Sequence, residues 1–196
     1  MSGITQKWVK LLSPFTTHYA AQLSASELAK TTHTPQQSTS RYLDTLVKLN
    51  IIEYAKKGKT KLFYLNLEKQ TTKTILNLLE NQKTLQFQLE HKEPATIINE
   101  LMKHCETTII FGSYANGTYD KESDLDIAII GKCDRTAIKN IKQKQIIEIN
   151  EHYATYQEFE KIVAQKNPLA IEIIKNHIIF GNISEISNMF WKHAKK

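Results

Sequence analysis

The chain has 196 residues, and its 26 lysines and arginines exceed its 20 aspartates and glutamates, so its formal charge is +6. With 41% apolar and 23% charged residues, six glycines and four prolines, the composition is that of a globular protein and excludes collagen-like and disordered chains. No apolar run approaches the roughly 20 residues that span a bilayer, and the first residues lack a signal-peptide pattern. We therefore expect a cytoplasmic protein that does not bind membranes.

The surplus positive charge lies in the first third of the chain. Up to Lys69 there are ten basic and four acidic residues, whereas the remainder has sixteen of each. This asymmetry favours a polyanion-binding module joined to a neutral one, although a basic face that is merely solvated remains the alternative. Two cysteines, Cys105 and Cys133, are too few for a disulfide framework and lack the spacing of a zinc site, so we expect ordinary packed thiols.

Residues 24–49 carry the signals of two capped helices joined by a tight turn. Ser24 and Glu27 form a capping box, and a short helix is expected to follow. Thr34 and Gln37 form a second predicted capping box. Thr34 is the N-cap, and Pro35 is at the first helical position, where its missing N–H is tolerated. We therefore predict a helix-turn-helix unit.

The second helix is expected to be amphipathic. Leu43, Leu46 and Val47 have the spacing of one helical face and should pack inward. The second helix of such a unit is the one that reads bases. The outward-facing candidates for DNA contact are Gln36, Gln37, Ser40 and Arg41.

Residues 51–67 follow as a predicted β-hairpin with Gly58 in its turn. Its tip carries four lysines that are candidates for phosphate contact: Lys56, Lys57, Lys59 and Lys61. The order over residues 4–68, a helix, a helix-turn-helix and a basic hairpin, resembles the winged helix-turn-helix domains of prokaryotic transcription regulators. That resemblance implies binding of duplex DNA, with dimerisation or protein docking as the alternative use of such a domain.

A domain organisation follows from these boundaries. We predict a nucleic-acid-binding domain over residues 1–69, a connecting helix over residues 70–92 and a second domain over residues 93–196. Ile75, Leu78 and Leu79 have helical spacing in the connecting segment, which we also expect to be a contact in a homodimer.

Two carboxylates mark the start of a predicted strand in the second domain. Residues 107–111 predict a buried strand that leads into Gly112 and Ser113, and residues 123–130 predict the next strand. Side chains alternate across a strand, so Asp124 and Asp126 should share one face about 7 Å apart. Such a pair favours a compensating cation, and oxygen ligands favour Mg²⁺. Two solvated carboxylates at a strand end are the alternative.

The loop between these strands is suited to phosphate. Gly112 permits close approach of the backbone to a ligand, and Ser113 offers a hydroxyl and an N–H. The stretch GSYANGTYDKESDLDIAII resembles the signature of the polymerase β-like nucleotidyltransferases, especially the minimal type found in archaea and bacteria. The resemblance covers about residues 95–181. It implies an α+β domain with a mixed sheet, in which Gly112 and Ser113 hold a nucleoside triphosphate and Asp124 and Asp126 bind one or two Mg²⁺ ions.

The chain departs from the family pattern at two positions. The family has a third carboxylate on a later strand that helps to activate the acceptor, and Glu148 is the candidate, with Glu151 as the second choice. Asn116, a predicted nucleotide-binding residue, stands where these small enzymes usually have arginine. We expect the loss of that cation to weaken triphosphate binding or to alter the choice of substrate, although asparagine can still donate hydrogen bonds. His152 and His177 flank the predicted site without the geometry of a triad or a zinc site, and we interpret both as structural.

The resemblance thus implies a Mg²⁺-dependent transfer of a nucleoside monophosphate from a triphosphate, with ATP favoured, by Asp124, Asp126 and Glu148. The acceptor is open: a nucleic-acid end, a small molecule, or a protein, as in antitoxins that adenylylate a HEPN-type RNase partner. The alternative function is a non-enzymatic DNA-binding regulator whose second domain senses nucleotide.

Overall fold

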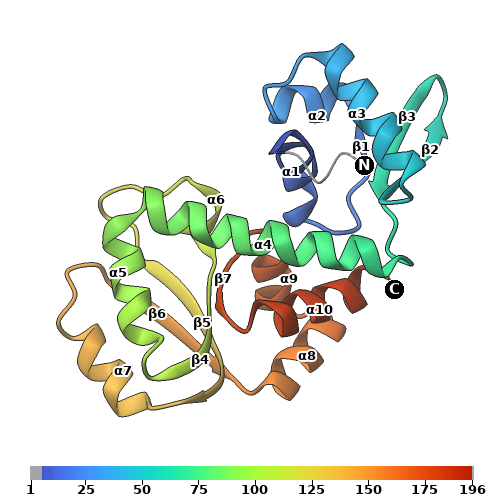
Figure 1. The fold of residues 1–196 in the computed structure, drawn as a ribbon. Coiled ribbons are helices and arrows are strands. Elements are labelled where there is room, and N and C mark those ends of the chain that lie inside the picture. The colour runs from blue at the N-terminus through green and yellow to red at the C-terminus, as the bar shows by residue number, and fades with distance from the viewer. Residues whose placement is uncertain (1–5, 196) are drawn as a thin grey trace. The chain divides into compact units, whose positions relative to one another are not determined.

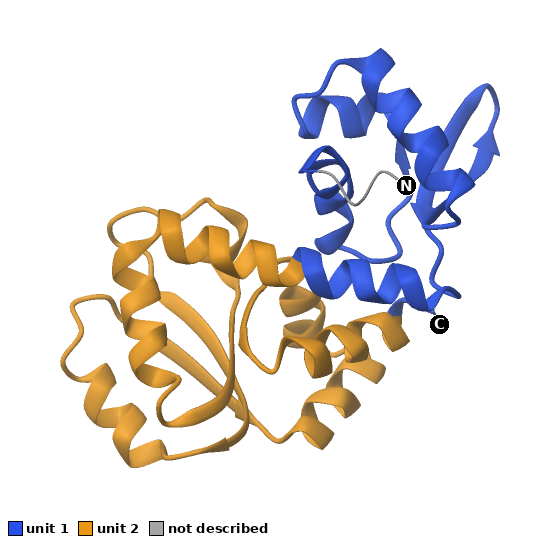
Figure 2. Cartoon of the chain, in the orientation of Figure 1, with its two compact units in different colours: residues 1–79, 194–196 blue, residues 80–193 orange. Residues whose placement is uncertain are grey.

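The computed structural model describes residues 6–195, which form two compact units (Figures 1 and 2). Unit 1 comprises the described residues up to Leu79 together with Ala194 and Lys195, and unit 2 comprises Glu80–His193. The boundary lies inside the long helix α4 (Gln70–Glu90), between Leu79 and Glu80, and not at residues 69/70 or 92/93, so the predicted division into domains stays a prediction. None of the described helices combines the length and the apolar character that a bilayer crossing requires.

Unit 1 is a small helical layer with a three-stranded antiparallel sheet in the order β1-β3-β2. The buried side chains of Leu28, Leu43 and Leu46 join its helices, and Ile52 and Phe63 add the apolar face of the sheet. Its elements before α4 are α1 (Gln6–Leu12), the 3₁₀ helix η1 (Ser13–Thr16), β1 (Leu23–Ser24), α2 (Ala25–Thr31), α3 (Gln36–Lys48), β2 (Ile52–Lys57) and β3 (Thr60–Leu65).

The two predicted helix caps have different outcomes. The capping box of α2 is present, because Ser24 accepts from Glu27 N and the Glu27 carboxylate accepts from Ser24 N at 2.7 Å. The second box was wrong: Pro35, not Thr34, is the N-cap of α3, and no side chain caps that end. The Thr34 hydroxyl instead donates a hydrogen bond to the carbonyl oxygen of Thr32 at 3.2 Å and accepts one from the Thr32 hydroxyl at 3.1 Å.

The hairpin β2–β3 closes where it was expected. Lys57 pairs with Thr60, and Gly58 in the turn has a φ of +60°, a left-handed conformation that glycine adopts without strain. Lys61 lies 4.4 Å above the ring of Tyr54 on the neighbouring strand, and that contact holds one lysine of the basic tip against the sheet.

Unit 2 is built on a four-stranded mixed sheet in the order β6-β5-β4-β7. β5 and β6 are parallel, whereas β4 is antiparallel to both β5 and β7, with Thr107 opposite Gly181. This is the α+β class with a mixed sheet and helices that we predicted. The elements are α5 (Lys92–Leu101), β4 (Cys105–Ile110), α6 (Gly112–Asn116), β5 (Leu125–Cys133), α7 (Arg135–Lys142), β6 (Ile149–Ala154), α8 (Tyr156–Ala164), α9 (Pro168–Lys175), β7 (Ile178–Gly181) and α10 (Ile183–Ala194).

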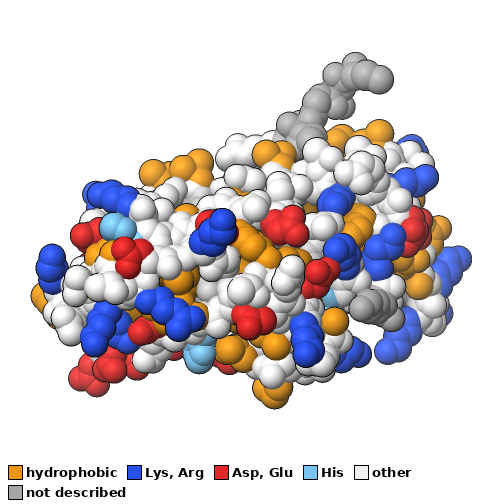
Figure 3. Space-filling model, turned by 90° about the horizontal axis from the view of Figure 1, so that it is seen from below, with side chains coloured by type: hydrophobic (Ala, Val, Ile, Leu, Met, Phe, Trp, Pro, Cys, Tyr) orange, Lys and Arg blue, Asp and Glu red, His pale blue; other side chains and the backbone are white. Residues whose placement is uncertain are grey.

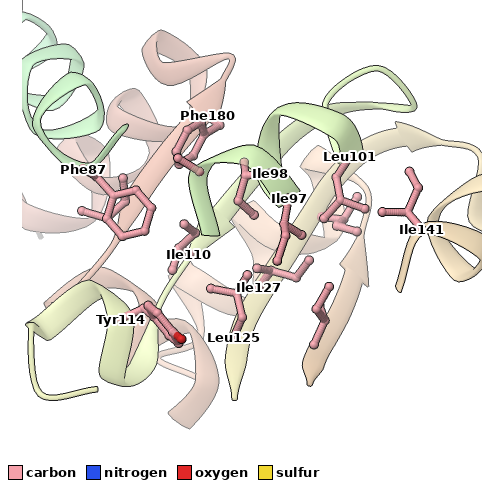
Figure 4. Packing of buried hydrophobic residues seen from close by; sticks show 14 of the residues in the cluster. Phe87, Ile97, Ile98, Leu101, Ile110, Tyr114, Leu125, Ile127, Ile141 and Phe180 are labelled. Atoms are coloured by element: carbon pink, nitrogen blue, oxygen red, sulfur yellow. The ribbon is translucent and has the colours of Figure 1, made fainter. Parts of the chain in front are cut away.

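One hydrophobic core cluster of unit 2 lies on one face of this sheet (Figure 4). Ile98 and Leu101 of α5 and Ile141 of α7 pack against Leu125 and Ile127 of β5, and all five are almost completely buried. Because strand residues alternate, Asp124 and Asp126 face the opposite side. That second side is covered in part by α8, which packs against β5 and β6.

The two cysteines and three leucines of α4 also relate to the predictions. Cys105 and Cys133 are half-buried free thiols, as expected. On α4, Leu78, Leu85 and Leu89 are exposed by 45%, 55% and 68%, and the dimer contact expected there stays a prediction.

A buried charged cluster links α4 to the segment between α9 and β7. The carboxylate of Glu80 lies 2.8 Å from Lys83 and 3.2 Å from Nε2 of His177, and both Glu80 and His177 are almost completely buried. Burial alone would raise the pKa of Glu80, but Lys83 and His177 outweigh it and lower that pKa to about 2. His177 thus has the structural role that we assigned to it.

Glu80→Gln is expected to lower the free energy of unfolding near neutral pH by roughly 1–3 kcal/mol, because it removes the buried carboxylate that pairs with Lys83 and contacts His177. Since the pKa of Glu80 is lower in the folded state, the wild-type protein should lose this stability as the pH falls from about 4.5 towards about 2. Urea unfolding across that range measures it. Glu172→Gln, an exposed change on α9, is the control, and an unchanged pH dependence in Glu80→Gln would contradict the assignment.

Candidate active site

Gly112 brings the backbone of the predicted phosphate loop against a carboxylate. β4 ends at Ile110, and Phe111 N donates a hydrogen bond to the carbonyl oxygen of Asp126 at 3.0 Å. Gly112 follows with a φ of +66°, and a Cβ at this position would overlap the Oδ2 atom of Asp126. The glycine is therefore required both for its backbone conformation and for the space that the Asp126 side chain occupies.

Asp124 and Asp126 are joined by a third polar residue, Asn150. In the parallel register Asn150 of β6 lies directly opposite Asp126 of β5. Its Nδ2 donates to Asp124 Oδ2 at 3.1 Å and approaches Asp126 Oδ1 at 3.4 Å. All three side chains are half-buried. The amide thus holds the two carboxylates in one cluster at the start of β5.

The side chain of Glu148, the predicted third carboxylate, lines a cavity with residues of α7. Glu148 precedes β6, its side chain is exposed, and its carbonyl oxygen accepts from Leu125 N at 2.8 Å. The second choice, Glu151, forms an ion pair with Lys142. Among residues 6–195, no three histidine, cysteine or acidic side chains are grouped so as to hold a metal. The structure therefore does not bring either glutamate to the aspartates, because the register places Asn150 beside them.

Asn150 was missed by sequence reasoning although a signal was present. The sequence predicted that Asn150 and Glu148 share a strand face, and only the pairing of β6 with β5 shows that Asn150 lies opposite Asp126. Carboxylate and amide oxygens are ligands that Mg²⁺ accepts, and it commonly uses one or two protein carboxylates. The oxygens of Asp124 and Asp126 therefore fit a divalent ion, and Asn150 supplies a neutral neighbour in place of a third charge.

The other two predicted nucleotide-binding residues lie in α6. Ser113 is half-buried, and its carbonyl oxygen accepts from Thr118 N at 3.1 Å. Asn116 is exposed, and its side-chain oxygen accepts from Thr118 N at 2.9 Å and from the Thr118 hydroxyl at 2.6 Å. Asn116 therefore closes the loop after α6, a local role that the sequence did not indicate.

The loop from α6 to Asp124 is ordered by contacts that sequence reasoning also missed. Tyr119 stacks on Tyr114 with 4.5 Å between ring centroids, and its hydroxyl lies 3.0 Å from Nδ1 of His91. Asp120 accepts from Glu122 N and from the Ser123 hydroxyl, and these bonds lower the pKa of its carboxyl. The segment that leads into the aspartates is thus fixed at both ends.

The predicted DNA-contact residues of unit 1 are all exposed. A cavity of about 530 Å³ lies between α3 and the hairpin and brings together four of them: Gln36, Ser40, Lys59 and Lys61. It does not include Gln37, Arg41, Lys56 or Lys57. Figure 3 shows one view of the surface, in which basic and acidic side chains are interspersed.

Residues 94–180 match the sequence-family model described as a nucleotidyltransferase domain, a range that contains Gly112, Asp124, Asp126 and Asn150. Two proteins of Methanocaldococcus jannaschii, both provisionally named protein adenylyltransferases, are similar to the chain. One is 34% identical over 91 residues, which cover 44% of this chain and 65% of that protein. The other is 39% identical over 64 residues, which cover 32% of this chain and 58% of that protein.

The chain therefore spans less than two thirds of the length of these curated relatives. No solved structure matches the chain significantly.

Proposed function

We propose, from the premise that residues 94–180 form a nucleotidyltransferase domain, that the chain transfers a nucleoside monophosphate from a triphosphate to a hydroxyl group of a protein. ATP is the favoured donor. The protein acceptor is supported by the two relatives, which are provisionally named protein adenylyltransferases. The single observation that carries the proposal is the cluster in which Gly112 lies against Asp126 while Asn150 bonds both aspartates.

The residues of this cluster have different roles in binding and positioning the substrate. Asp124 and Asp126 would hold Mg²⁺, which when bound neutralises charge on the transferring phosphate. Gly112 and Ser113 offer backbone and hydroxyl groups for the outer phosphates. Asn150 keeps the two carboxylates together, and it carries no charge that would repel an incoming triphosphate.

The reaction that fits this arrangement is an in-line displacement. The acceptor oxygen forms a bond to the α-phosphorus, the bond from that phosphorus to the bridging oxygen of pyrophosphate breaks, and the acceptor proton passes to solvent. Because the residue that contacts both aspartates is Asn150 and not a third carboxylate, catalysis would rest on positioning and charge neutralisation more than on a protein base.

The test is incubation of the full chain with each of the four labelled nucleoside triphosphates and Mg²⁺, with candidate protein acceptors that include a HEPN-type RNase. Transfer of label to a protein supports the proposal. Nucleotide binding without any transfer overturns it and favours a nucleotide sensor. Transfer to the RNase would further support an antitoxin role.

We also propose that unit 1 is a winged helix-turn-helix module that binds duplex DNA. The support is the order of α1, β1, α2, α3 and the hairpin β2–β3, together with the exposure of Gln36, Ser40, Lys59 and Lys61 around one cavity. In such a module α3 would lie in the major groove and the hairpin lysines would contact phosphate.

Duplex binding by the full chain should fall about 100-fold between about 50 and 200 mM salt, because roughly four lysine–phosphate contacts release counterions. Fluorescence anisotropy with a labelled duplex measures the slope. Lys59→Ala with Lys61→Ala should reduce that slope by about 2, whereas Lys175→Ala, an exposed change in unit 2, should leave it unchanged. No binding at the lowest salt would exclude the module's proposed role.

A further inference from the structure

β6 forms one outer edge of the sheet of unit 2. It pairs with β5 through six residues, and no other strand among residues 6–195 pairs with it (Figure 1). The backbone N–H and C=O groups on the second edge of β6 therefore have no partner strand among the described residues. Such an edge is a template on which an extended chain can add a strand.

The two faces of β6 carry different chemistry. On one face, Asn150 contacts both aspartates, and His152 is exposed with its ring 5.8 Å from that of Phe111, the residue before Gly112. Glu151 and Tyr153 project from the other face, where they line a cavity of about 630 Å³. This single strand thus separates the candidate active site from the cavity.

The cavity on the second face is basic. Arg135, Lys139 and Lys142 of α7 line it together with Glu148 and Glu151. Lys142 pairs with Glu151, and Arg135 lies 4.5 Å above the ring of Tyr153. Within the described part of the chain neither Arg135 nor Lys139 forms an ion pair, so two cations remain available to an acidic ligand. Ile146, which is 97% exposed, adds an apolar contact at this cavity.

We propose that the free edge of β6 is the docking site of the protein acceptor, which binds as an extended strand with acidic side chains at alternate positions. The proposal rests on the proposed nucleotide transfer. In a strand added about 4.8 Å from β6, successive side chains would point to opposite faces. Acidic residues would enter the cavity beside Arg135 and Lys139, and the residue between them would project beside Asn150, on the face of the aspartates.

In this arrangement, a different part of the site recognises each feature of the acceptor. Backbone pairing with β6 fixes the register, the two cations select acidic neighbours, and the alternation aims the accepting side chain. A folded helix or a disordered basic tail would satisfy none of these contacts. The acceptor class is therefore an acidic segment that is extended, or becomes extended on binding.

The test uses the full chain and a fluorescein-labelled peptide with the sequence Glu-Thr-Glu-Thr-Glu-Thr-Glu, followed by anisotropy. We expect saturable binding, and at least about tenfold weaker binding of the matching Lys-Thr peptide. Arg135→Gln with Lys139→Gln should weaken binding of the acidic peptide at least about fivefold. Lys103→Gln with Lys175→Gln, two exposed lysines of unit 2 outside the cavity, should leave it unchanged.

Two methylated peptides test the strand pairing itself. One carries N-methyl groups on the threonines and the other on the internal glutamates. In a paired strand only one of these sets of N–H groups faces β6, so one peptide should bind and the other should not. Any other pattern, or no binding of the unmodified peptide, overturns the docking proposal.

Nucleotide binding by the same preparations separates the two proposals. Arg135→Gln with Lys139→Gln should bind labelled ATP as the wild type does, because neither residue belongs to the cluster around the aspartates. Peptide binding without nucleotide transfer would overturn the proposed function alone, and nucleotide transfer without strand pairing would overturn the docking site alone.

Discussion

Asp124→Asn is expected to reduce nucleotide transfer at least about a thousandfold while the protein stays folded. The substitution removes one of the two negative charges that would hold the divalent ion, yet it keeps the shape of the side chain. Its amide oxygen still accepts from Asn150 Nδ2, which is 3.1 Å from Asp124 in the wild type. The initial rate of label transfer measures the effect, and circular dichroism with thermal unfolding confirms the fold.

A nearby carboxylate provides the matched control. Glu122 is exposed in the same loop, two residues before Asp124, and Glu122→Gln removes the same charge without touching the cluster. Its transfer rate should remain within about twofold of the wild type, as expected for a solvated charge. If Asp124→Asn retained most of the activity, the two aspartates would not be the centre of the reaction.

Gly112→Ala is expected to reduce nucleotide transfer about 100-fold or more and to destabilise the protein by roughly 1–3 kcal/mol. A Cβ at Gly112 would overlap Asp126 Oδ2, and the φ of +66° is unfavourable for alanine. The carboxylate would have to turn away, which would break its approach to Asn150 and change the position of the outer-phosphate loop. The transfer rate and the midpoint of urea unfolding measure the two effects.

Gly117→Ala separates strain from collision. Gly117 ends the same short helix with a φ of +78°, but no atom lies within 4 Å of a Cβ built there. Alanine should therefore cost backbone strain at both positions, whereas the cost of the collision and the loss of transfer should be confined to Gly112→Ala. Equal losses of activity would mean that backbone strain in the loop, and not the space beside Asp126, controls the reaction.

Local signals predicted the parts of this protein whose structure depends on residues close in sequence. The capping box of Ser24, the turn at Gly58 and the pair of aspartates at the start of β5 were all predicted, because short-range hydrogen bonds and strand alternation determine them. The Thr34 cap was wrong because the same hydroxyl had a competing partner in Thr32.

The third residue of the cluster could not be chosen from local signals. The sequence pattern allows either Glu148 or Asn150 to face the aspartates, and a carboxylate fits the family pattern better. The choice depends on how β6 aligns with β5, across a helix and a loop, and the register of a parallel pair is set by packing of the whole unit. The same holds for the stacking of Tyr119 on Tyr114 and for the cavity between β6 and α7.

The pairing of β4 with β7 gives the chain a particular order of assembly. Residues 107–110 of β4 have two partner strands, and one of them, residues 178–181 of β7, lies far along the chain. Before β7 pairs with β4, one edge of β4 has no partner strand, although β5 and β6, which position the aspartate cluster, do not pair with β7. Completion of the sheet therefore depends on a contact between distant parts of the chain, the kind of contact that slows folding because a long loop must close first.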